Sequence, residues 1–69
     1  MTTSLYIETA RAALARAAWA RGEKPAYDEE AIIDLLADMR HWCRSAGVDY
    51  DRCDQCAASH YRNEIGSAS

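Results

Sequence analysis

Apolar residues recur at helical spacing in three segments of this chain, and nowhere do they alternate with the period of two that a half-buried strand requires. The three segments are residues 5–21, 29–46 and 50–64. The second has the strongest pattern, and its predicted core face comprises Ile32, Leu35, Leu36, Met39, Trp42, Cys43 and Ala46. The spacing therefore predicts an all-α fold, a compact three-helix bundle built from these segments.

Capping residues fit the same boundaries. Asp28 is placed to cap the N-terminus of the second helix, and Asp49 that of the third. Gly47 is expected to end the second helix in the left-handed conformation. Since 69 residues suffice for one small domain, we expect a single domain over residues 1–69, with frayed termini at about 1–3 and 66–69.

The inner face predicted for the third helix comprises Tyr50, Cys53, Ala57, Tyr61 and Ile65. The first helix differs because it is apolar on two sides. One side carries Tyr6, Ile7, Ala10, Ala13, Leu14, Ala17 and Ala18, and the other carries Leu5, Ala12, Ala15 and Trp19. A chain this short has too little structure to cover both sides. The pattern predicts that Trp19 anchors a partner protein or a second copy of the chain.

The charge distribution opposes direct binding to nucleic acid. The net charge is −3, and residues 25–69 hold nine acids against four arginines, whereas phosphate contacts require cationic side chains. An acidic surface instead fits a basic protein partner. The predicted partner-binding carboxylates are Glu30, Asp34, Asp38, Asp49, Asp51 and Asp54. The alternative interpretation is a solvated surface that keeps a small protein soluble.

Three cysteines and a histidine offer a second hypothesis. Cys43, Cys53, Cys56 and His60 have the ligand types of a Cys3His zinc site, which would make this a zinc-stabilised domain. Against it, a Cys-x2-Cys pair of a zinc site normally lies on a tight turn, and no Gly or Pro is placed to make one. The alternative is that two of the thiols pack in the core and Cys56 lies on the surface. We expect no resident cofactor, with zinc as the exception to test.

Neither catalysis nor membrane insertion is expected. His41 follows Asp38 by three residues and His60 follows Cys56 by four, but no Gly-rich turn or third orienting group accompanies either pair. No segment approaches the ~20 apolar residues of a membrane span. The N-terminus lacks the basic start of a signal peptide, so we expect a cytosolic protein. The missing catalytic groups predict that it is not an enzyme.

The stretch Ile32–Cys43, followed by Gly47-Val48-Asp49-Tyr50 and later by His60-Tyr61, resembles a group of small helical proteins carried by phages and other mobile elements of proteobacteria. Their shared pattern reads D-L-L-A-D-L-x-H, then G-[LV]-D-[FY], then a helix ending near H-[FY]. The resemblance covers about residues 27–64 and does not include Cys53 or Cys56. It implies a mobile-element origin and no particular activity.

In size, charge and implied origin the chain is also similar to anti-CRISPR proteins, which typically bind a CRISPR effector complex stoichiometrically. The hypothesis is therefore a small acidic phage protein that binds and inhibits a basic nucleic-acid-binding complex such as a CRISPR effector. The alternatives are the zinc-stabilised domain and a homodimeric regulatory or assembly protein of a mobile element that self-associates through its first helix.

Overall fold

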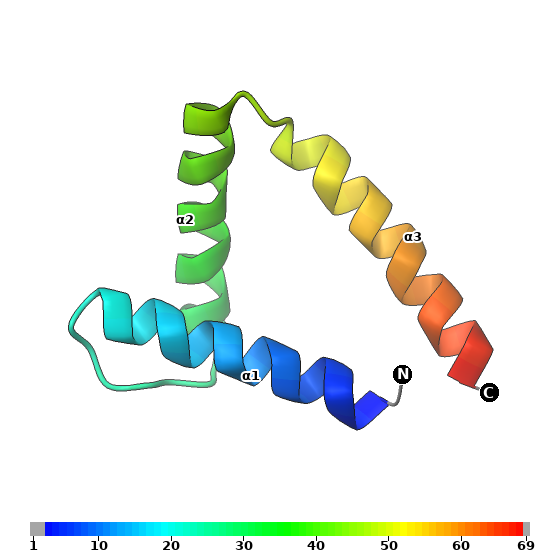
Figure 1. Cartoon of the computed structure of the whole chain (residues 1–69), viewed down its shortest axis with the longest axis horizontal. Helices are drawn as coiled ribbons and strands as arrows, with labels where there is room; N and C mark the ends of the chain where they lie inside the picture. Colours follow the sequence, from blue (N-terminus) through cyan, green and yellow to red (C-terminus); the bar gives the residue numbers. More distant parts are fainter. Residues whose placement is uncertain (1–2, 69) are drawn as a thin grey trace. The chain divides into compact units, whose positions relative to one another are not determined.

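Helices account for almost all of the regular structure. The computed structural model describes the backbone of residues 3–68 and the side chains of residues 3–66. It contains α1 (Thr3–Ala20), α2 (Glu29–Ala46) and α3 (Tyr50–Ala68), with no strand in that part of the chain (Figure 1). Contacts join α1 to α2 and α2 to α3. The predicted all-α, three-helix fold class is confirmed.

Local capping explains where α2 begins and ends, and both ends agree with the prediction. The Asp28 carboxylate accepts a hydrogen bond from the Ala31 amide at 2.9 Å. At the other end Gly47 has a φ of 74°, and the Val48 amide donates to the Cys43 carbonyl at 2.8 Å. These are the features of a Schellman C-cap, in which a left-handed glycine lets the chain turn back over the last carbonyls. Asp49 caps α3 by accepting from the Arg52 amide at 3.1 Å.

The helix termini next to the ends of the chain differ from the prediction. Thr3 already belongs to α1, and α3 continues through Ala68. Residues 3 and 66–68 have helical backbone geometry, and their expected fraying stays a prediction. The predicted fraying of residues 1–2 and 69 lies outside the described residues. Gly22, also at a φ of 74°, ends α1 in the same way that Gly47 ends α2.

The chain divides within α2 into two compact units. The first ends at Asp38 and contains α1, the connecting loop and the first half of α2; the second begins at Met39 and contains the rest of α2 and α3. In the first unit, Leu14, Ala17 and Ala18 of α1 line a cleft of about 310 Å³ against the loop and the beginning of α2. The small alanine side chains let this part of α1 lie close to its neighbour.

The predicted core is largely exposed. Cys43 is the buried hydrophobic residue of the described part, with 7% of its surface accessible, and Leu35 is half-buried. Other members of the predicted core face of α2 are exposed, and Trp42 reaches 64%. On the predicted inner face of α3 only Tyr50 is half-buried, while the other four residues are exposed. A pair of helical segments covers only the stripe along which its members touch, so each unit leaves the flanking apolar residues in water.

Candidate partner-binding surface

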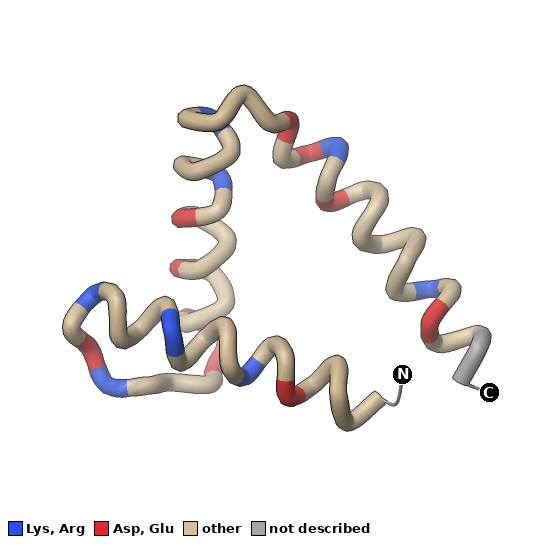
Figure 2. Tube along the Cα trace, in the orientation of Figure 1, with Lys and Arg blue, Asp and Glu red and all other residues tan. Residues whose placement is uncertain are grey.

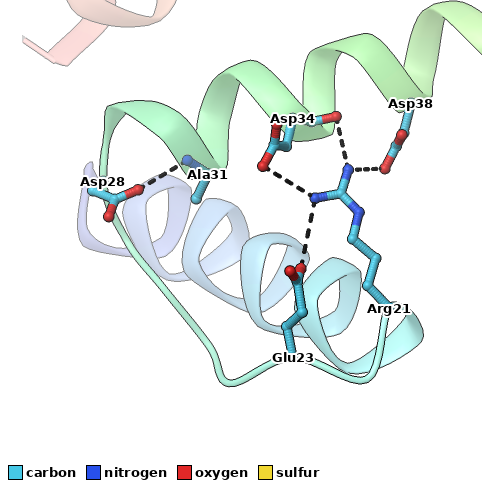
Figure 3. A network of polar contacts seen from close by, with 6 residues as sticks. All are labelled: Arg21, Glu23, Asp28, Ala31, Asp34 and Asp38. Carbon is cyan, nitrogen blue, oxygen red and sulfur yellow. Dashed lines mark hydrogen bonds and ion pairs between the residues drawn. The ribbon is translucent and has the colours of Figure 1, made fainter.

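Arg21 organises the acidic side chains of the first unit. Its guanidinium pairs with the carboxylates of Asp38, Asp34 (3.4 Å) and Glu23 (4.0 Å), and it also donates to the Asp34 carbonyl oxygen at 3.0 Å (Figure 3). Arg21 directly follows α1, whereas Asp34 and Asp38 lie one turn apart on α2. The planar fork of an arginine can meet several oxygens at once, so this one side chain ties the end of α1 to α2.

The three carboxylates also act on the arginine. The hydrogen bond with Asp38 raises the pKa of the Arg21 guanidinium, and attraction to Asp38, Asp34 and Glu23 raises it further, while desolvation opposes the shift. Arg21 therefore stays charged wherever the protein is folded. Asp34 and Asp38 were predicted to face a partner; the structure shows that both already have a cation of the same chain beside them.

A smaller arrangement of the same kind lies in the second unit. Arg40 of α2 approaches the Asp51 carboxylate at 3.5 Å, and its guanidinium lies over the Tyr50 ring, 4.3 Å from the centroid. Asp49 is engaged as the N-cap of α3. Two of the three carboxylates at the beginning of α3 therefore have structural roles. The side chains of Arg40 and Asp51 are 60% and 77% exposed, so water screens this pair strongly.

Two predicted partner residues have neither a cation nor a capping hydrogen bond among the described residues, and we call them uncompensated. Glu30 on α2 and Asp54 on α3 are exposed, and within the described part of the chain neither carboxylate has a cation within ion-pair distance. Glu30 belongs to the first unit and Asp54 to the second. Figure 2 shows the acidic positions of α2 and of the beginning of α3 in red. These two are the carboxylates most available to a basic partner. Three other predicted carboxylates are exposed as well, but each forms an ion pair with an arginine of the same chain: Asp34, Asp38 and Asp51.

Trp19 lies on the surface as the sequence predicts, with 68% of its area accessible. The Arg16 guanidinium covers one face of the ring at 3.9 Å from the centroid, a cation–π contact that favours one ring orientation. Trp42 is a second exposed tryptophan, which the sequence does not reveal because helical spacing places it in the apolar stripe of α2. Apolar spacing identifies a face but does not say whether anything covers it.

The four residues of the zinc hypothesis are not brought together as one site. All three cysteines are free thiols; Cys43 is buried, whereas Cys53 and Cys56 are exposed on α3. Among the described residues, no three His, Cys, Asp or Glu side chains are grouped to hold a metal ion. The thiol at the end of α2 therefore differs from those of α3 in its burial.

No described helix is long and apolar enough to cross a bilayer.

The arginine contacts could not be found from spacing alone. In the sequence Arg21 only marks the end of the first predicted helix, and Arg40 is one basic residue among the acids of the second. A third contact places the Arg11 guanidinium over the Tyr27 ring at 4.2 Å, joining α1 to the loop.

No protein-family model, curated protein or solved structure matches this chain.

Proposed function

We propose that this chain is a protein-interaction module that binds and inhibits a basic nucleic-acid-binding complex, in the stoichiometric manner of an anti-CRISPR protein. The observation that supports it is the exposure of large apolar side chains together with uncompensated carboxylates. Twelve large hydrophobic residues are exposed within the described part of the chain, among them both tryptophans. Soluble monomers rarely leave large apolar surfaces uncovered, and such surfaces mark interaction sites.

Charge and apolar contact have separate tasks in this proposal. Carboxylates steer the encounter with a cationic surface and select against anionic ones, which changes the association rate more than the final affinity. The aromatic side chains then supply the buried contact area, and Trp19 is the predicted anchor. Because Asp34 and Asp38 already contact Arg21, the steering is assigned first to Glu30 and Asp54.

Charge reversal at the two uncompensated carboxylates tests the proposal. The measurement is inhibition of target-DNA binding by purified CRISPR effector complexes, with the protein titrated to find the stoichiometry. Glu30→Lys and Asp54→Lys are expected to weaken inhibition, and low salt is expected to strengthen that of the unmodified chain. Glu8→Lys makes the same charge change on α1, away from the predicted partner-binding carboxylates of α2 and α3. It should leave inhibition unchanged.

Two results contradict this function. If no effector complex is inhibited at a protein excess, the anti-CRISPR assignment is wrong. If inhibition occurs but Glu8→Lys reduces it as much as Glu30→Lys does, net charge rather than a defined surface is responsible. Circular dichroism of each variant establishes that the helices are retained.

The exposure of α1 also favours the alternative of a homodimeric regulatory or assembly protein. No residue of α1 is buried, and Leu5, Ile7 and Trp19 are exposed along it. A second copy of α1 would cover these residues. Sedimentation of the unmodified chain against Trp19→Ala decides between the two: a dimer lost on substitution supports the alternative, and a monomer in both cases removes it.

A further inference from the structure

The middle of α3 carries three metal-ligating side chains with no assigned task in the proposed function. Cys53 and Cys56 are free thiols on the surface, and His60 is exposed one turn beyond the second. The zinc hypothesis from the sequence relied on Cys43, which is buried at the end of α2. Removing it from the set leaves ligands that all come from one helix and all face water.

Helix geometry selects which of these ligands can share an ion. Cys56 and His60 are four residues apart, so their Cβ atoms lie ~5–6 Å from each other on one face. Helical ligand pairs at this spacing bind zinc in the H-E-x-x-H proteins. Cys53 and His60 are seven residues apart, roughly 10 Å along the axis, which is too far for one ion. This agrees with the finding that no three described side chains are grouped around a metal position.

Two ligands make half of a zinc site. Structural zinc is almost always held by four protein ligands in a tetrahedron. A second copy of the chain supplies the missing pair by symmetry, because a two-fold axis presents the same residues from both sides. The site is therefore incomplete in one chain and complete in two.

Electrostatics favours Cys56 with His60 over the other pair, Cys53 with Cys56. Two thiolates and two neutral imidazoles balance the charge of Zn²⁺, whereas four thiolates leave a net charge of −2. Each chain already carries −3, so the neutral set avoids adding anionic charge where two acidic chains meet.

The surroundings of the pair permit two helices to approach. No charged residue lies between Asp54 and Arg62, which Figure 2 shows as an uninterrupted tan stretch in the middle of α3. Residues three or four positions from Cys56 or His60 flank the pair on its helical face, and they include the small Ala57 and Ser59. The charged residues on this face are Arg52 and Glu64. Because these two charges are opposite in sign, a second copy of the segment need not meet like charge here.

We propose that Cys56 and His60 form half of a zinc site that the same two residues of a second copy complete, so that zinc joins two chains through α3. On binding, each thiol releases its proton to solvent and the thiolate donates a sulfur lone pair to the ion, while each neutral imidazole donates a nitrogen lone pair. The inference is independent of the proposed inhibitory function, and it differs from a dimer through α1 because it requires metal.

Zinc titration of the full chain, reduced and freed of metal, tests the site. Sedimentation gives the mass, and replacement of zinc by Co²⁺ reports tetrahedral thiolate ligation through its visible absorption. The expected result is a doubling of mass at one zinc for every two chains. Cys56→Ser and His60→Ala should each abolish the metal-dependent doubling, and circular dichroism should show the helices intact.

Cys53→Ser is the matched control, since it changes the same atom one turn away on the same face. It should retain the zinc-dependent dimer. The inference is overturned if zinc leaves the mass unchanged, if each chain binds an ion of its own, or if Cys53→Ser loses the dimer as completely as Cys56→Ser. Trp19→Ala separates this dimer from one through α1, because only the latter depends on that side chain.

Discussion

Replacing Asp49 should separate its structural role from its charge. The Asp49 carboxylate accepts a hydrogen bond from the Arg52 amide at 3.1 Å and lies at the positive end of the α3 dipole. Loss of a capping acceptor costs about 1 kcal/mol. Loss of the negative charge near the helix N-terminus costs a further ~0.3–1 kcal/mol. Asp49→Ala should therefore lower the free energy of unfolding by about 1–2 kcal/mol.

Asp49→Asn keeps an oxygen that can accept from Arg52 and removes only the charge, so it should cost less than about 1 kcal/mol. Urea and thermal unfolding followed by circular dichroism measure both variants. For a chain of this length each kcal/mol corresponds to roughly 4–8 °C in Tm. Asp54→Ala removes an exposed acid beyond the first turn of the same helix and should stay within about 0.5 kcal/mol of the unmodified protein. Equal losses for the Ala and Asn variants would refute the capping argument.

Three further predictions concern the arginine contacts, a turn and the thiols. Arg21→Gln should speed hydrogen exchange in the last turns of α1, because it removes the side chain that ties this end to α2. Arg62→Gln should not, because Arg62 donates to Ser59 of its own helix. Gly47→Ala should lower the free energy of unfolding in urea by roughly 1 kcal/mol, because a φ of 74° strains any L side chain even though the space around it is open. Gly66→Ala in α3 is the control and should be neutral or stabilising. Under native conditions a thiol reagent should react rapidly with the two cysteines of α3 and slowly with Cys43; equal rates for all three would contradict the burial of that residue.

Local signals in the sequence were sufficient to define the helices. The bounds of α2 agree with the prediction at both ends because Asp28, Gly47 and Asp49 satisfy helix termini within a few residues of themselves. Capping hydrogen bonds of this kind depend on neighbours in the chain and not on tertiary packing. The same reasoning placed Trp19 on the surface, since a helix apolar on two sides exceeds what so short a chain can cover.

Burial and charge pairing were decided by tertiary structure. Helical spacing assigned Trp42 to the core, but a face becomes core only when another element covers it, and the structure leaves this side chain 64% exposed. The predicted acidic surface changed for a similar reason. Arg21 reaches oxygens of residues 13 and 17 positions later in the chain. No local pattern encodes that approach, because it arises only once α1 and the beginning of α2 lie side by side. The sequence alone determined the helices and their caps. Packing within the first unit determined which of its carboxylates remain available to a partner.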